Sequence, residues 1–516
     1  MSALVAKLRA LLMIPESEPL DFPFVDSDVA RFQRLRHDPA RHAIDATTWK
    51  DLLLGEWRRL LSPEVSIFGQ HVLYQRLCDG VEGQEQPGRI RALMADPAAL
   101  AALHGQCTSL RRADKEIATL LYEDAAPPVP WWAGKTWPLT LALLLTIAGA
   151  ALSPLSWLGT AFVMYLLVAG QMRYYARVEE FARSVQSLQM LLRVDSLLQG
   201  PARSGKINRD LTRSQMVLLI PGARGYLDWF MLDNVNHYFR CVQLVHANLD
   251  YLRERFEHIA NLEADIALAR HLLKTPQFCW ADAAGVDRMA LDGMVHPMLP
   301  EAQPLSMALN GKGAFISGQN GIGKSTLLRS VGLNLVAARA FGFCYATRAS
   351  VPHVPVYASM QAEDNLFGGE SLYMAELRRA KELLAAADGP HPGICVIDEI
   401  FRGTNHMESV SAAASVLDVL AARGLVIVSS HNLVLAPLLQ HRLDPLCVAK
   451  GGDGALTLSP GVLAHTNGIA LLAQRGFGAG IEGNAARVFD WLSGYLAHPA
   501  DSAQVLGRRA IEPKAA

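Results

Sequence analysis

Hydrophobic and polar positions change their spacing along the chain and divide it into a helical part and an alternating part. Between Val245 and Ile266 the apolar residues recur at steps of four and three, which predicts a long helix packed against other helices. Amphipathic helices are also predicted over Asp45–Leu77 and from Phe181 to Leu198. From about Gly313, short apolar strands alternate with helices, which predicts an α/β domain with a largely parallel sheet.

One apolar run differs from the others because it has no charged residue. From Trp137 to Met172 there is no Asp, Glu, Lys, Arg or His, and Ser153-Pro154 interrupts the run. We therefore predict a two-helix transmembrane hairpin with spans Leu139–Leu152 and Leu155–Met172. Because each half is shorter than an ideal span, a helical hairpin buried in a protein core is the alternative. Basic and aromatic residues at both outer ends favour a membrane, with both ends on the cytoplasmic side: Trp131, Trp132, Lys135, Trp137, Arg173, Tyr174, Tyr175 and Arg177.

Composition changes this interpretation only slightly. Hydrophobic residues make up 51% of the chain and charged residues 19%, which agrees with part of the apolar surface being covered by lipid. The net charge of −1 gives no overall basic footprint for a nucleic acid. The seven cysteines are scattered without C-x-x-C spacing, which argues against a zinc or redox site of that type. The first residues do not resemble a secretory signal, so we expect the domains outside the membrane to face the cytoplasm.

A glycine-rich loop provides the first candidate chemistry. Gly318-Gln-Asn-Gly-Ile-Gly-Lys-Ser325 follows a strand-like segment and opens a helix, which is the pattern of a Walker A phosphate-binding loop. The loop's backbone N–H groups and the helix N-terminus favour phosphate, the lysine holds the β and γ phosphates, and the serine hydroxyl binds Mg²⁺. The predicted nucleotide-binding residues here are Gly318, Asn320, Gly321, Gly323, Lys324, Ser325 and Thr326.

Two later strands end in polar residues. The apolar run Ile394–Ile397 is followed by Asp398, the predicted Mg²⁺ ligand of a Walker B motif, and Glu399, the predicted base that polarises the attacking water. Solvated acids at the end of an ordinary strand are the alternative. His431 follows the next strand and could sense the γ-phosphate or hold the water, although a lone histidine there is more often structural.

These motifs occur together in the order found in the MutS family of DNA mismatch-repair ATPases. The loop is similar to the family's P-N-M-G-G-K-S-T, and Asp398–Thr404 resembles D-E-I-G-R-G-T. Asp364–Leu377 resembles D-D-L-x-x-G-x-S-T-F-M-x-E-M, Ser430-His431 resembles the family's T-H, and Thr466–Ala470 resembles S-Y-G-I-x-x-A.

The resemblance implies a fold, partners and further site residues. It implies a MutS-like P-loop ATPase domain with ATP and Mg²⁺, and a homodimer in which Ser371 of one subunit completes the nucleotide site of the other. It also implies that ATP drives movement of helical arms on DNA. The residues before the helical core are too few for the family's mismatch-reading domain and contain no Phe-x-Glu motif, so we expect a membrane-anchored branch that lacks this domain.

Together these patterns predict five segments. They are an N-terminal helical region (1–129), a transmembrane hairpin with its linker (130–177), a helical lever region (178–290), an ATPase domain (291–498) and a disordered tail (499–516). The predicted function is ATP hydrolysis in DNA repair-related work at a bacterial-type inner membrane, with an unidentified protein client as a further partner. An ABC-type ATPase and a nucleotide-gated membrane protein acting on a client other than DNA are the alternatives.

Overall fold

The computed structural model describes residues 21–38, 42–80, 85–123, 128–213, 223–360, 372–389, 393–451, 454–464, 467–469, 471 and 479–495. By their contacts the residues form two compact units. The first is helical and comprises 1–37, 62–75 and 92–270. The second contains the sheets and comprises 38–61, 76–91 and 271–516. The second unit therefore includes two short N-terminal stretches that the sequence patterns had assigned to the helical region.

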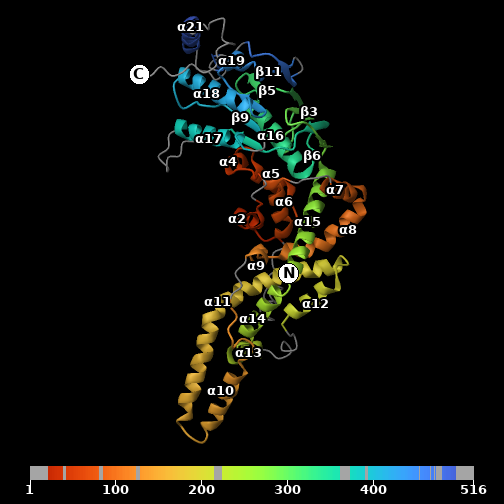
Figure 1. The fold of residues 1–516 in the computed structure, drawn as a ribbon, viewed down its shortest axis with the longest axis vertical. Coiled ribbons are helices and arrows are strands. Elements are labelled where there is room, and N and C mark those ends of the chain that lie inside the picture. Colours follow the sequence, from red (N-terminus) through yellow and green to blue (C-terminus); the bar gives the residue numbers. More distant parts are fainter. Residues whose placement is uncertain are drawn as a thin grey trace. The chain divides into compact units, whose positions relative to one another are not determined.

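The first unit is built from helices, as its periodicity predicts (Figure 1). The predicted heptad helix is α15, whose buried residues include Leu252, Phe256 and Ile259. Val245 belongs instead to the preceding helix, α14. The helices mainly in this unit are α2 (Asp26–Val29), α3 (Arg31–Arg36), α6 (Ile67–Asp79), α8 (Pro97–Cys107), the 3-10 helix η1 (Thr108–Arg112), α9 (Ala118–Tyr122), α10 (Trp137–Gly149), α11 (Ser156–Leu197), α12 (Ala202–Leu211), α13 (Ala223–Met231), α14 (Asp233–His246) and α15 (Leu249–Lys274).

The charge-free run forms a helical hairpin, but the prediction that it spans a membrane is not supported. Among the described residues no helix is both long enough and apolar enough to cross a bilayer. α10 has 13 residues, or roughly 20 Å at 1.5 Å per residue, against about 30 Å of hydrocarbon. α11 has 42 residues, and its apolar first part continues without a break into a charged part. The separate helix predicted from Phe181 to Leu198 is largely the second half of α11.

The second unit confirms the predicted α/β region with a largely parallel sheet. Its six strands run in the order β12-β11-β5-β10-β9-β8, and all neighbouring pairs are parallel except β11 and β12. Four further strands form a second sheet in the order β2-β7-β3-β4, and β1 pairs with β6. The strands are β1 (Cys279–Trp280), β2 (Asp282–Ala283), β3 (Arg288–Met294), β4 (Leu305–Asn310), β5 (Gly313–Gly318), β6 (Phe343–Cys344), β7 (Arg348–Val351), β8 (Val356–Ser359), β9 (Ile394–Asp398), β10 (Val426–Ser429), β11 (Leu443–Lys450) and β12 (Leu456–Pro460).

Helices pack against the six-stranded sheet and close its core. α17, α18 and α19 share one hydrophobic core with the strands, while α16 contacts β8, β9 and β10. Phe315 on β5 is fully buried in this core. The remaining helices are α4 (Ala46–Asp51), α5 (Leu54–Leu61), α7 (Glu85–Ala95), α16 (Lys324–Phe341), α17 (Leu372–Ala387), α18 (His406–Ala421), α19 (Leu435–Leu439) and α21 (Ala479–Tyr495).

The N-terminal helix α4 covers β8, the edge strand of the six-stranded sheet. The Thr48 hydroxyl oxygen accepts a hydrogen bond from the N–H of Ala358 at 2.9 Å, and the buried Asp51 carboxylate accepts one from the N–H of Met360 at 2.7 Å. Arg379 on α17 is paired with Asp45, the residue that caps α4, at 3.2 Å. Residues far upstream in the sequence thus complete the α/β unit, and they satisfy backbone groups of an otherwise open sheet edge.

Candidate active site

The predicted Walker A residues form the turn between β5 and the N-terminus of α16. β5 is buried along its whole length, and α16 begins at Lys324. Gly321 and Gly323 have φ angles of 75° and 104°, a left-handed conformation that favours glycine. The glycines therefore let the chain reverse so that the first turn of α16, with Ser325 and Thr326, meets the end of the strand.

The Lys324 ammonium group lies inside this loop. Its Nζ atom donates hydrogen bonds to the carbonyl oxygens of Gly318 at 3.0 Å and Gln319 at 3.2 Å. Burial lowers the pKa of Lys324, and the negative charges of Asp398 and Glu399 partly offset this effect. The loop thus holds a cation near two carboxylates, Asp398 at the end of β9 and Glu399 directly after it.

Asp398 is brought to the loop by the order of the parallel strands. β10 lies between β5 and β9, and Ser429 on β10 is in register with both Ile316 and Asp398. The Ser429 hydroxyl donates a hydrogen bond to the Asp398 carboxylate. Since the carboxyl ends of parallel strands meet at one sheet edge, residues far apart in sequence converge there.

Glu399 is held in an unusual backbone conformation beside Asp398. Its φ angle is 58°, rare for a residue other than glycine, and its N–H donates to the Ser429 carbonyl at 3.0 Å. Its Oε1 atom lies 2.7 Å from Nε2 of His431, and its Oε2 atom lies 3.6 Å from Nε of Arg402. The hydrogen bond to His431 is the main cause of a lowered Glu399 pKa, to which Arg402 and Lys324 also contribute. Glu399 is therefore an ionised carboxylate at neutral pH, as a base must be.

Two residues of this site were quoted within motifs but were not singled out from the sequence. The buried Glu376 on α17 accepts hydrogen bonds from the N–H groups of Arg402 at 3.0 Å and Gly403 at 3.1 Å. It thereby fixes the loop that follows Glu399. The signal that could have found it is the M-x-E-M pattern, in which it is the acid.

Asn467 is the second such residue, and it contacts the glycine-rich loop directly. Its Oδ1 accepts a hydrogen bond from the N–H of Asn320 at 2.9 Å, and its Nδ2 donates to the Asn320 carbonyl at 3.3 Å. Both polar groups of Asn320's main chain are thus bound by one side chain. Asn467 occupies the tyrosine position of the S-Y-G-I-like segment, so the family pattern alone gives no reason to expect an amide here.

The structure brings together Lys324, Asp398, Glu399 and His431, but it does not describe Ser371. The segment Asp364–Leu377 overlaps 361–371, which lies outside the described residues, so the contribution of Ser371 across a dimer stays a prediction. Within the described ranges no group of three or more His, Cys, Asp or Glu side chains is placed to hold a metal ion. Mg²⁺ would instead have the Ser325 hydroxyl and the Asp398 carboxylate as protein ligands, both oxygen donors of the kind that this ion prefers.

Comparison with known proteins identifies the region that contains this site. Residues 314–445 match the model of MutS domain V. The chain is 28% identical over 291 residues to the DNA mismatch repair protein MutS of Natronomonas pharaonis, covering 53% of this chain and 34% of that protein. It is 28% identical over 239 residues to the Thermus aquaticus protein of the same name, covering 44% of this chain and 28% of that protein.

A differently named relative matches over a shorter region. Endonuclease MutS2 of Thermus thermophilus is 33% identical over 186 residues, which cover 35% of this chain and 24% of that protein. The matched regions thus span about a third or less of each relative's length. By this match and by these relatives, the region 314–445, which contains the candidate site, belongs to the MutS family.

Proposed function

We propose that this protein binds ATP and Mg²⁺ and hydrolyses ATP to ADP and phosphate. One observation carries the proposal: a buried lysine in a glycine-rich loop faces Asp398 and Glu399, and Glu399 is bonded to His431. A phosphate-binding cation and an ionised base at the same edge of a parallel sheet are what phosphoryl transfer to water needs.

Each side chain has a distinct role in the proposed reaction. Lys324 exchanges its two carbonyl contacts for β- and γ-phosphate oxygens, and the helix N-terminus at Ser325 and Thr326 adds N–H donors. Ser325 and Asp398 hold Mg²⁺, which when bound neutralises phosphate charge. Glu399 accepts a proton from the attacking water, and His431 orients the Glu399 carboxylate.

We further propose that two copies assemble through their ATPase domains and act on DNA. The supporting observation is that the relatives are named DNA mismatch repair proteins. In this proposal Ser371 acts on the partner's nucleotide, and ATP binding moves the helical unit. Because the matches cover about a third or less of those relatives, mismatch recognition itself is not part of the proposal.

Two alternatives use the same nucleotide site with a different client. An ABC-type ATPase would be stimulated by a transported substrate, and a nucleotide-gated protein would bind ATP without releasing phosphate. The Glu399–His431 pair favours hydrolysis over mere binding, because a scaffold that only binds ATP needs no base.

The test is the rate of phosphate release by the purified full chain, without DNA and with duplex, mismatched or branched DNA over a series of salt concentrations. We expect release that DNA increases, with less stimulation at higher salt because phosphate contacts release counterions. The Lys324→Ala variant should neither bind ATP nor release phosphate. Release that no DNA changes would leave the ATPase proposal standing but contradict the DNA proposal. Normal ATP affinity in Lys324→Ala would contradict the proposed loop function.

A further inference from the structure

The hairpin of α10 and α11 carries the largest group of exposed apolar side chains among the described residues. Leu152 at the turn is 91% exposed and Leu158 is 69% exposed. Soluble surfaces rarely leave such a contiguous patch uncovered, so it indicates a binding surface. The exposed members are Leu141, Leu144, Leu145, Ile147, Leu152, Leu155, Trp157, Leu158, Phe162, Tyr165, Leu166, Val168 and Met172.

The exposed residues surround the hairpin instead of lining one face. On α11 they occur at steps of one to four residues, which covers about half of the helix circumference. The other half packs on the hairpin partner and on α14, through buried residues such as Val163 and Leu167. The two outer halves point away from each other, so one protein partner could cover only part of this surface. A lipid phase would surround all of it.

The base of the hairpin has the residues expected where lipid headgroups begin. Trp132, which precedes α10, and Tyr174 on α11 lie side by side at the base of the hairpin, with their ring centroids 5.7 Å apart. Around that level Trp131, Trp137 and Tyr175 are exposed, and so are the basic residues Lys135, Arg173 and Arg177. Exposed aromatics suit the membrane interface, and the basic groups complement anionic phospholipids. The nearest acids on α11 are Glu179 and Glu180, and Glu180 is paired with Lys115 at 3.0 Å.

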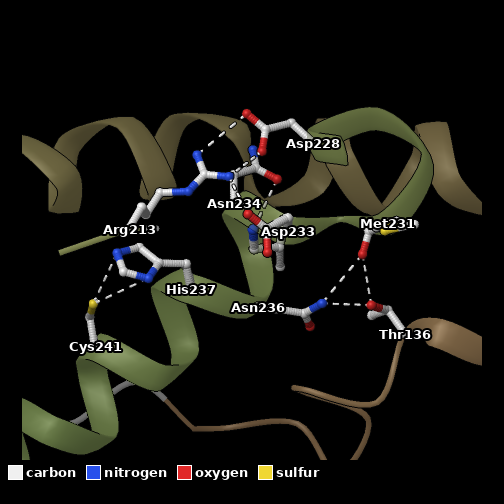
Figure 2. A network of polar contacts seen from close by, with 10 residues as sticks. Thr136, Arg213, Asp228, Met231, Asp233, Asn234, Asn236, His237 and Cys241 are labelled. Carbon is white, nitrogen blue, oxygen red and sulfur yellow. Dashed lines mark hydrogen bonds and ion pairs between the residues drawn. The ribbon is translucent and has the colours of Figure 1, made fainter. Parts of the chain in front are cut away.

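A polar network holds this base on the helical unit (Figure 2). Asn236 on α14 donates to the Thr136 hydroxyl at 2.6 Å and accepts from the N–H of Gly134 at 3.0 Å. Nearby, Arg213 is paired with Asp228 and Asp233, each at 2.5 Å. The base is therefore fixed by directional bonds, while the distal part has no charged side chain and exposes mainly apolar ones.

An apolar cavity beside the hairpin extends this surface. Its volume is about 400 Å³, and it lies between α11 and α13, lined by Met164, Leu167, Val168, Tyr226, Trp229 and Phe230. Tyr226 and Trp229 are themselves exposed. An elongated acyl chain matches such a cavity, because its lining offers almost no hydrogen-bonding group.

We propose that the α10–α11 hairpin embeds tip-first in a lipid surface, without crossing it, with Lys135, Arg173 and Arg177 at the headgroups. The apolar helices extend roughly 20 to 26 Å from that level, less than the ~30 Å of a bilayer's hydrocarbon. This agrees with the absence of a described helix that could span. The proposal does not depend on the ATPase function.

Flotation of the full chain with phospholipid vesicles tests the proposal. We expect flotation with phosphatidylcholine and more with added phosphatidylglycerol. The double variant Leu158→Glu, Phe162→Glu should partition at least about tenfold less, because charged side chains are costly in hydrocarbon. The control Leu60→Glu, at a 42% exposed leucine on α5, should bind as the wild type does. Unchanged flotation of the double variant would overturn the proposal. A second result would also overturn the proposal: the wild type does not float, and it forms an oligomer without lipid that the double variant does not form. In that case a second copy of the chain would cover the hairpin.

Depth is tested at Ser153, in the turn between the helices. A Ser153→Cys chain bound to the outside of vesicles should not react with an impermeant maleimide trapped inside, with the wild type as the control for native cysteines. Reaction at the introduced cysteine would show that the hairpin crosses, and would overturn partial embedding. Brominated lipid should quench the tryptophan fluorescence of the wild type, and it should quench the fluorescence of Trp157→Phe less. Equal quenching in the wild type and Trp157→Phe would contradict insertion of the tip.

Discussion

Glu399 combines backbone strain with a fixed charge partner. Its left-handed φ of 58° costs on the order of 1 kcal/mol relative to an extended residue, and the hydrogen bond from its N–H to Ser429 helps to maintain it. The conformation turns its side chain toward His431. We infer that the strain is retained because it aims the carboxylate.

The pH dependence of phosphate release tests this pairing. The hydrogen bond to His431 is the main cause of the lowered Glu399 pKa, so His431→Ala should raise that pKa. Since Glu399 must be ionised to accept a proton, the acidic limb of the rate profile should move to higher pH. His258→Ala, at an exposed histidine on α15, is the control. An acidic limb that stays in place in His431→Ala would show that His431 does not set the charge of Glu399.

Asn467 holds the glycine-rich loop through both polar groups of Asn320. Asn467→Ala removes two hydrogen bonds of roughly 1 kcal/mol each, so we expect ATP affinity to fall by several-fold to about thirtyfold. Titration with a fluorescent ATP analogue measures it. Asn484→Ala, which removes a surface bond on α21, should leave affinity unchanged. Equal affinity in Asn467→Ala and the wild type would mean that the loop keeps its shape without this contact.

The sequence predicts those residues whose type is required by phosphate and Mg²⁺ binding. Lys324, Asp398 and Glu399 were expected because phosphate and Mg²⁺ require particular groups at the ends of a loop and a strand. The supports Glu376, Ser429 and Asn467 were not singled out, because their contacts depend on how strands and helices distant in sequence come together.

Among the elements, α4 shows how a short helix completes a sheet. It caps the edge strand β8 through Thr48 and Asp51, although about 300 residues separate them in sequence. No local pattern could predict this contact, because an amphipathic helix can pack on many surfaces. The strands themselves were predictable from their apolar runs.

The buried Asp51 carboxyl group at this contact should make the free energy of unfolding depend on pH. Burial raises the pKa of Asp51, so the stabilising contribution of this residue is greatest at low pH and falls as pH rises from the unfolded-state pKa through the raised folded-state pKa. Asp51→Asn keeps an acceptor for the Met360 N–H without the buried charge. Its free energy of unfolding, relative to wild type, should therefore increase from acid to neutral pH. Asp51→Ala leaves the N–H unsatisfied and should lose about 1–3 kcal/mol at either pH. Chemical unfolding measures both, and a pH-independent difference for Asp51→Asn would contradict the assignment.

The hairpin shows where pattern alone was insufficient. The charge-free run and its break correctly indicated two helices, but sequence pattern could not show that α11 continues for 42 residues into a charged segment. Helix length depends on packing against α12, α13 and α14, which the periodicity of one segment does not specify.

At the scale of the whole molecule, each unit has its own task in our account. The α/β unit carries the nucleotide site, and the helical unit carries the hairpin. The resemblance in the second half of the chain was specific because several motifs agree in order, and the match to MutS domain V, from 314 to 445, covers all of them except Thr466–Ala470. The helical unit offered only periodicity, so its role rests on the vesicle and DNA experiments.

The role of Glu399 in ATP hydrolysis is tested by comparing phosphate release by the wild type and the Glu399→Gln variant, with ATP binding measured in the same samples. Glutamine cannot accept the proton of the attacking water, so release should fall by about 10²- to 10⁴-fold while ATP binding is kept. Glu254→Gln, at an exposed glutamate on α15, should match the wild type. Equal release by the wild type and Glu399→Gln would contradict the proposed mechanism.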